Sequence, residues 1–164
     1  GACTALVTPF LDDHVNYPMM ERLLQRQLDA GIEAVVICGT TGESATMTEA
    51  EHVECIKKAV EFTKGRIPVV AGTGSNATYT AIELSREAVE VGVDGLLVIT
   101  PYYNKATQKG LYEHYKLLAR EVDAPIVLYN VPSRTGVNIL PDTAPAQDST
   151  PVQTFHPAIY EGFV

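Results

Sequence analysis

Short apolar runs alternate with longer helical patterns along most of this chain, and this alternation limits the possible folds more than any other feature. Strands are predicted over residues 2–7, 34–38, 67–71, 95–100 and 125–129. Helices are predicted over residues 17–30, 48–64, 78–91 and 107–122. Strands that recur about every 30 residues with a helix between them are typical of consecutive βα units around a parallel sheet. The runs are apolar almost throughout, which predicts that both faces of the sheet are covered.

The periodicity leaves two architectures open. A doubly wound open sheet fits the 164 residues, whereas a complete (β/α)8 barrel needs roughly 200 or more. About four and a half βα units are visible. After Asp142 the pattern changes, because prolines interrupt a stretch without helical or strand periodicity. We therefore expect one folded unit over residues 1–142, an irregular tail over residues 143–164, and a C-terminus that is truncated or altered.

Composition and charge argue against several classes of partner. The formal charge of −8 disfavours nucleic acids and anionic membranes. No apolar stretch approaches the roughly 20 residues that span a bilayer. The three cysteines are widely spaced and make no zinc pattern, so no metal is expected and a reducing cytoplasm is the predicted compartment. Cys3 and Cys38 lie in apolar runs and are predicted to be small core residues.

Polar side chains collect where the predicted strands end. Thr40 and Thr41, flanked by glycines, follow the second strand, and Tyr103 follows the fourth. Tyr129 ends the fifth strand, and Arg134 lies just beyond it. In α/β folds this edge of the sheet builds the functional site. Hydroxyl groups can relay protons and a guanidinium can grip a carboxylate with two hydrogen bonds, so the pattern predicts a site for a small carboxylate-bearing substrate.

Other candidate motifs are weaker. Gly72-Thr73-Gly74 starts like a dinucleotide-binding loop, but Ala77 stands at the third glycine position, so this motif is rejected. His52 and His114 lie within helical patterns and form no ligand set with the other histidines. We predict that both histidines lie at the surface.

Five stretches of the chain, which include these strand ends, resemble the dihydrodipicolinate synthase family of pyruvate-dependent, class I aldolase-type enzymes. They are Thr4–Phe10, Gly39–Ser44, Ala71–Gly74, Thr100–Asn104 and Tyr129–Gly136. Their order and spacing match the family from the start of the chain to about Asp142. The threonine pair and the Ser-Arg-Thr-Gly sequence favour the synthases over related sialic-acid lyases, and another pyruvate lyase of this superfamily stays an alternative.

The resemblance implies a (β/α)8 barrel that assembles as a homodimer or homotetramer and uses no cofactor. It also implies condensation of pyruvate with aspartate semialdehyde through a Schiff base on a lysine. Thr41, Tyr103 and Tyr129 would form a proton relay, with Tyr103 reaching into a neighbouring subunit. Thr40 and Thr41 would hold the pyruvate carboxylate, and Arg134 would hold the carboxylate of the semialdehyde.

The resemblance further implies an effector site for lysine and points to a missing nucleophile. The effector would contact residues at a dimer interface, namely Ser44, Ala45, His52, Asn76 and Tyr102. Glu49 and Thr80 depart from the lysine-sensitive pattern, which argues against feedback inhibition. The family's Schiff-base lysine follows the sixth strand, and no lysine of this chain maps onto it. We therefore expect impaired activity, or an inactive half-barrel that self-associates.

Overall fold

The parallel sheet is singly wound. In the computed structural model, which describes residues 1–143 and 152–155, a six-stranded sheet runs in chain order from one edge to the other. Its strands are β1 (Cys3–Ala5), β4 (Ala34–Ile37), β5 (Val69–Gly72), β6 (Gly95–Ile99), β7 (Ile126–Tyr129) and β8 (Val152–Phe155). A doubly wound sheet reverses its strand order partway across, and this sheet does not. The structure is therefore part of a barrel, as the family resemblance implied.

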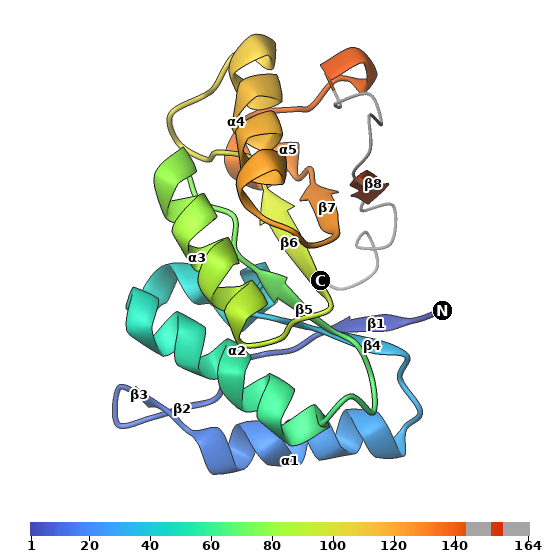
Figure 1. Cartoon of the computed structure of the whole chain (residues 1–164). Helices are drawn as coiled ribbons and strands as arrows, with labels where there is room; N and C mark the ends of the chain where they lie inside the picture. Colours follow the sequence, from blue (N-terminus) through green and yellow to red (C-terminus); the bar gives the residue numbers. More distant parts are fainter. Residues whose placement is uncertain (144–151, 156–164) are drawn as a thin grey trace.

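Four long helices, counted within the described residues, connect the strands and lie along one side of the sheet (Figure 1). They are α1 (Tyr17–Asp29), α2 (Glu49–Thr63), α3 (Thr78–Glu90) and α4 (Gln108–Glu121). Each boundary lies within one residue of the sequence prediction. Successive helices pack against each other, and α2 and α3 also contact the strands. A short hairpin, β2 (Phe10–Leu11) with β3 (His14–Val15), has no counterpart among the predicted elements.

Side-chain caps determine where the helices start. Thr48 Oγ1 accepts the N–H of Glu51 at 3.2 Å, and the Glu51 carboxylate accepts the N–H of Thr48 at 3.1 Å. This reciprocal pair is the predicted capping box. Asn16 and Thr107 accept backbone N–H groups at the starts of α1 and α4. Hydrogen bonds from the backbone and hydroxyl of Thr48 lower the pKa of the Glu51 carboxyl, which keeps it charged beside the positive end of α2.

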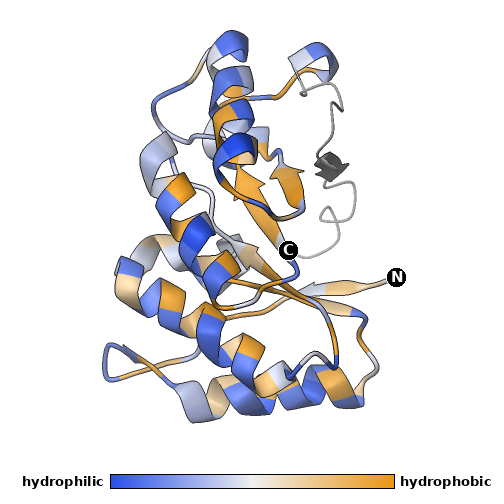
Figure 2. Ribbon diagram, in the orientation of Figure 1, coloured by the Kyte–Doolittle hydropathy of each residue, from blue (hydrophilic) through white to orange (hydrophobic). Residues whose placement is uncertain are grey.

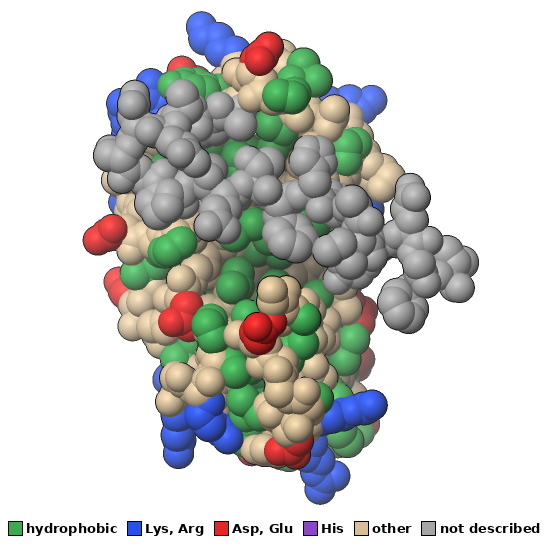
Figure 3. Space-filling model, turned by 90° about the vertical axis from the view of Figure 1, so that its right-hand side faces the viewer, with side chains coloured by type: hydrophobic (Ala, Val, Ile, Leu, Met, Phe, Trp, Pro, Cys, Tyr) green, Lys and Arg blue, Asp and Glu red, His purple; other side chains and the backbone are tan. Residues whose placement is uncertain are grey.

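The two faces of the sheet are buried to different extents. Val35, Leu96 and Val98 face the helices and are fully buried. Their strand neighbours Val36 and Leu97 point to the opposite face and are half-buried. Strands β4 to β7 are largely apolar (Figure 2), and apolar side chains gather near the middle of this second face (Figure 3). The prediction of two covered faces is wrong in this respect, because no described helix lies on the second face.

The C-terminal segment contains a strand that the sequence does not predict. Val152–Phe155, within the stretch expected to be irregular, pair in parallel with β7. The register places Val152 opposite Ile126 and Phe155 opposite Tyr129. The free edge of β7 offers backbone donors and acceptors to any extended segment beside it, so pairing here does not need a long apolar run. The other residues of the expected tail, 144–151 and 156–164, lie outside the described part of the chain.

Two histidines that were expected at the surface are buried instead. His52 and His114 have relative exposures of 6% and 4%. The His52 Nε2–H donates to the carbonyl of Gly72 at 2.7 Å, and His114 Nδ1 lies 2.9 Å from the hydroxyl of Thr78. Burial lowers the pKa of both rings, that of His114 to about 4. Both rings are therefore neutral near pH 7 and serve to join helices to neighbouring elements.

The cysteines also differ in part from expectation. Cys38 is buried, as predicted, and its thiol lies 3.7 Å from the carbonyl oxygen of His52. Cys3 is exposed rather than buried, because it begins the edge strand β1. Cys55 is fully buried on α2. Cys3 and Cys38 thus differ in burial because of their positions within the sheet. An apolar run alone does not reveal these positions.

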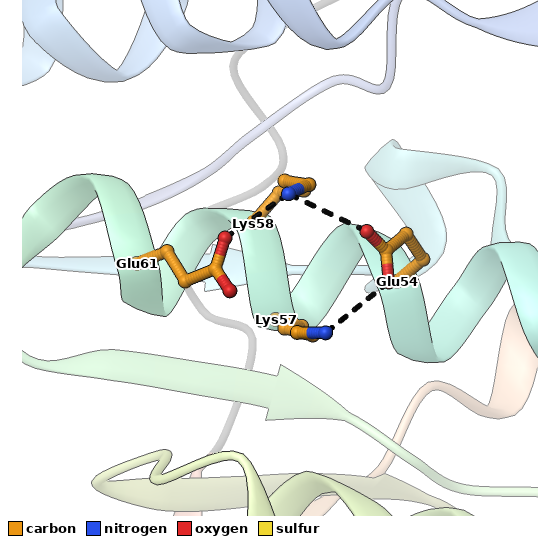
Figure 4. Close-up of polar contacts among 4 residues, drawn as sticks. All are labelled: Glu54, Lys57, Lys58 and Glu61. Atoms are coloured by element: carbon orange, nitrogen blue, oxygen red, sulfur yellow. Dashed lines mark hydrogen bonds and ion pairs between the residues drawn. The ribbon is translucent and has the colours of Figure 1, made fainter.

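The outer surface of α2 carries a network of exposed charges (Figure 4). Lys58 Nζ lies 3.5 Å from Glu54 and 3.1 Å from Glu61, and Lys57 lies 4.0 Å from Glu54. These side chains are between about a third and a half exposed, so solvent screens their attraction. The network is therefore an ordinary solvated helix surface, and α2 owes its place in the fold to its buried face.

Buried His114 predicts a pH-dependent loss of stability. Its folded-state pKa of about 4 lies below the ordinary value of 6.5, so the unfolded chain binds the proton more readily. This difference corresponds to roughly 3 kcal/mol, fully available above about pH 6.5 and lost as the pH falls toward 4. We expect the urea unfolding free energy to fall less steeply over this range in His114→Asn than in the unsubstituted chain. Equal slopes would contradict this assignment.

Candidate active site

The carboxyl edge of the sheet holds unusual backbone conformations. Cys38 and Glu43 have φ angles of 56° each, and Tyr103 and Lys105 have φ angles of 73° and 47°. All four residues follow the carboxyl ends of β4 or β6. Left-handed backbone is costly for residues with a side chain and persists where the surrounding structure enforces it. The loops at this edge are therefore held in specific shapes, as a binding site requires.

The threonine turn after β4 is braced from β1. Thr40 and Thr41 lie in a short 3-10 turn (Thr40–Gly42). The Thr8 hydroxyl donates to the carbonyl of Gly42 at 2.7 Å. A Cβ at Gly42 would meet this hydroxyl at 3.3 Å and the carbonyl of Leu6 at 3.2 Å, so glycine allows the close approach. The hydroxyl of Thr8, which follows strand β1, thus sets the position of the threonine pair.

Two glycines, one at the end of β5 and one two residues beyond it, allow neighbouring strands to come close. A Cβ at Gly72 would lie 2.3 Å from the carbonyl oxygen of Cys38, and a Cβ at Gly74 would lie 2.4 Å from the amide nitrogen of Ile99. Between them, the hydroxyl of Thr73 lies 2.8 Å from that of Ser85 on α3. The Gly-Thr-Gly sequence therefore serves close packing of backbone, in line with the rejection of a dinucleotide-binding loop.

The segment after β7 places Arg134 through a set of buried hydrogen bonds. Arg134 lies on the short helix α5 (Pro132–Thr135), which ends at Gly136 with a φ angle of 70°. Asn130 is buried; its amide donates to Asn138 Oδ1 at 2.8 Å and its oxygen accepts the N–H of Ile139 at 3.1 Å. The Thr135 hydroxyl also bonds within this segment. Sequence reasoning missed Asn130 and Thr135 as supports, although an asparagine directly after a strand is a signal for such a turn.

A cavity of about 440 Å³ opens at this edge and collects most of the predicted site residues. The predicted residues that line it are Thr40, Ser44, Ala45, His52, Tyr102, Tyr129 and Arg134. Tyr129 is half-buried, whereas Thr40 and Arg134 are exposed. A hydroxyl, a phenol and a guanidinium from the ends of β4 and β7 therefore face one space, which can hold a small carboxylate.

Three predicted site residues lie outside this cavity. Thr41 is exposed, and Tyr103 is 89% exposed. Within the described residues, no hydrogen bond joins Thr41, Tyr103 or Tyr129 to one another. Asn76 is half-buried and uses its carbonyl to accept a hydrogen bond from Asn104. A single chain therefore brings Tyr129 to the cavity but does not assemble the predicted proton relay.

Four of the five expected effector residues share the cavity with Thr40, Tyr129 and Arg134, whereas Asn76 lies outside it. His52 lies at its wall with Glu49 and Thr80. Burial lowers the pKa of His52 most, while the hydrogen bond to the carbonyl of Gly72 and the charge of Glu49 partly offset that effect. Because its Nε2–H is committed to Gly72, His52 reaches the cavity as a neutral, fixed group. The geometry thus joins the two expected sites in one continuous space within this chain.

Other functional features are absent from the part of the chain that the structure describes. No group of three or more His, Cys, Asp or Glu side chains there is placed to hold a metal ion. No described helix combines the length and apolarity needed to cross a membrane. The cavity lining, within residues 1–143, contains arginine but no lysine. A Schiff base therefore has no amine among the residues that face the described cavity.

Comparison with known proteins agrees with this geometry. Residues 1–147 match the model of the dihydrodipicolinate synthetase family, so the chain belongs to that family. It is 58% identical over 145 residues to the 4-hydroxy-tetrahydrodipicolinate synthase of Lachnoclostridium phytofermentans. That alignment covers 88% of this chain and 49% of the relative. The chain thus spans about half the length of the curated relatives it matches.

Solved structures extend the comparison to three dimensions. The dihydrodipicolinate synthase of Aquifex aeolicus is 53% identical and superposes with a TM-score of 0.86 over 87% of this chain and 49% of its own. The chloride-inhibited enzyme of Acinetobacter baumannii, solved with pyruvate, is 43% identical with a TM-score of 0.89. That match covers 94% of this chain and 55% of the other. These superpositions support the partial-barrel fold.

The close approach at Gly74 predicts a site-specific loss of stability. In Gly74→Ala the new methyl group would meet the backbone of Ile99, which cannot move aside as a flexible side chain would. We expect a loss of about 1–3 kcal/mol in urea unfolding. Gly95→Ala is the matched control, because its nearest contact is an ordinary 3.5 Å to the carbonyl of Pro125. Equal effects of the two substitutions would refute the close-packing role of Gly74.

Proposed function

We propose that this chain forms the substrate-binding part of a 4-hydroxy-tetrahydrodipicolinate synthase, which condenses pyruvate with aspartate semialdehyde. The observation that carries this proposal is the cavity where Thr40, Tyr129 and Arg134 meet at the carboxyl edge of the sheet. Membership of the family supports the same reaction. The pyruvate complex of the Acinetobacter enzyme supports a keto acid as one substrate of such a fold.

The chemistry of the cavity supports a separate role for each group. The Thr40 hydroxyl, held in its braced turn, can donate to the pyruvate carboxylate, and Thr41 would share this carboxylate and take part in the proton relay. The Arg134 guanidinium, exposed at the mouth, can bind the carboxylate of the semialdehyde. Tyr129 would pass a proton, and the exposed Tyr103 would join the relay from a neighbouring copy.

The proposal places the Schiff-base amine outside this chain. The lysines of the sequence are Lys57, Lys58, Lys64, Lys105, Lys109 and Lys116. They lie on α2, on α4 or in the adjoining loops, and none lines the described cavity. Without an amine, pyruvate is not converted to the enamine that attacks the aldehyde. We therefore infer that the chain by itself binds substrates but does not condense them.

The cellular setting of the proposed enzyme is a reducing compartment such as the cytoplasm. Cys3, Cys38 and Cys55 are all free thiols. Proteins of oxidising compartments commonly pair their cysteines, whereas reducing compartments keep them as thiols. The free thiols therefore support this setting.

Substitution of Arg134 tests the proposed substrate contacts. In Arg134→Ala, loss of a charge-assisted hydrogen bond is expected to raise the dissociation constant for aspartate semialdehyde about 10- to 100-fold. The affinity for pyruvate should change little, because Thr40 contacts that carboxylate. Chemical-shift titration of the labelled chain measures both constants. Ser133→Ala, a neighbouring exposed position on α5, is the control. Equal affinities in Arg134→Ala and the control would overturn this assignment.

The half-buried face of the sheet favours a second candidate property, self-association. Val36, Val70 and Val127 point to this face, and Val7, two residues beyond β1, remains 49% exposed. Burial of apolar surface stabilises association by about 25 cal/mol per Å². Such a face favours a homodimer or larger assembly of this chain.

Light scattering on the chain as it elutes from a sizing column tests self-association. We expect a mass of at least twice 17.8 kDa, since a second copy would remove apolar side chains from water. Leu97→Gln, on the half-buried face, should shift the mass toward that of one chain. Leu117→Gln, an exposed residue on the helical side, is the control. A monomer with cooperative unfolding would contradict this property.

A further inference from the structure

Tyr103 occupies a strained and exposed position between β6 and α4. Its side chain is 89% exposed, and its backbone has a φ angle of 73°. Lys105, two residues later, is also left-handed with a φ angle of 47°. An exposed tyrosine does not hold such a backbone by its own contacts, because it has few. The surrounding loop must therefore contain the group that maintains this conformation.

Asn104 is that group. Its backbone N–H donates to the carbonyl of Tyr102 at 2.9 Å, which closes the chain tightly around Tyr103. Its side-chain amide donates to the carbonyl of Asn76 at 3.0 Å, across 28 residues of sequence. The first hydrogen bond lies within the loop after β6, and the second ties this loop to the loop after β5. Asn104 thus clamps Tyr103 from the following residue, with both of its nitrogens engaged.

The segments on either side of this hydrogen bond are themselves held in place. Asn76 lies two residues before Thr78, the first residue of α3, whose hydroxyl bonds to the buried ring of His114 on α4. Thr107 caps the start of α4 by accepting the N–H of Gly110 at 3.2 Å. The loop that carries Tyr103 therefore begins on a strand, ends on a capped helix, and is held in its middle by Asn104. Removal of the Asn104 side-chain amide would therefore release only the middle of this loop.

We propose that Asn104 is a positioning residue that holds Tyr103 outward for its part in a shared active site. This inference rests on the proposed function, in which Tyr103 contributes a phenol to the proton relay of a neighbouring copy. A positioned phenol can transfer a proton efficiently because its geometry is set before the substrate arrives. Asn104 acts through Tyr103 and does not itself contact substrate.

Relaxation measurements on the 15N-labelled chain test the clamp without substrate. We expect the order parameter of the Tyr103 amide to fall from about 0.85 to below about 0.6 in both Asn104→Asp and Asn104→Ala. The aspartate variant keeps the shape of the side chain but removes the donor. Lys105→Ala, in the same loop and with no side-chain hydrogen bond or ion pair among the described residues, is the control and should keep Tyr103 rigid.

Two further readings distinguish positioning from a general structural role. The Tyr79 amide, on the first turn of α3, should keep its order parameter, and urea unfolding should be unchanged in the Asn104 variants. An unchanged Tyr103 order parameter in both variants would overturn the proposal, as would an equal loss of order at Tyr79. Because no substrate is present, this failure is distinct from a failure of Arg134 to bind the semialdehyde.

Discussion

The structure depends on one packing constraint: each βα unit returns its chain to the same side of a parallel sheet. Helices α1 to α4 therefore cover one face, and the strands of the six-stranded sheet, β1 and β4 to β8, follow each other in chain order (Figure 1). The side chains between these layers, such as Val35 and Leu96, are fully buried and carry the hydrophobic stabilisation. All the strands also end at a common edge, and that edge is where the polar groups gather.

The candidate site is built by backbone proximity as much as by functional side chains. Gly72 and Gly74 allow three strands to approach more closely than side chains permit. Thr8, Asn130 and Asn104 then use single polar groups to hold the three loops that carry Thr40, Arg134 and Tyr103. Thr8 holds the threonine turn from the segment after β1, and Asn104 ties its own loop to the loop after β5, whereas Asn130 bonds within the segment after β7. Cavity shape is therefore a property of the folded edge and not of any one loop.

The sequence predicts much of this fold, because the relevant signals are local. Helix α2 begins at its capping box and all four long helices fall within one residue of expectation. Whether the sheet reverses its order is not a local property, so periodicity left the barrel and the doubly wound sheet as alternatives. The resemblance to the family resolved that choice, and the strand order confirms it. The Cys3 error has the same origin, since an edge strand and a central strand look alike in sequence.

Some missed features had a signal in the sequence. His52 precedes Cys55 and Ile56 by three and four residues, and His114 precedes Leu118 by four, so both rings lie on the apolar stripe of a helix. The sequence contains a partial signal for the shared cavity, since the polar side chains that line it lie at or just after the ends of strands. The left-handed backbone of Tyr103 and the hydrogen bond from Asn104 to Asn76 had no signal, because both arise from tertiary structure. Strand β8 depends likewise on the edge that β7 provides.

We propose that this chain carries the groups that bind a keto acid but not the amine that captures it. Incubation of the chain with pyruvate and borohydride, followed by mass spectrometry, tests it directly, with the Aquifex synthase as the positive control. We expect a reduced lysine adduct on the control and an unmodified mass for this chain. An adduct on any of its lysines would overturn the proposal.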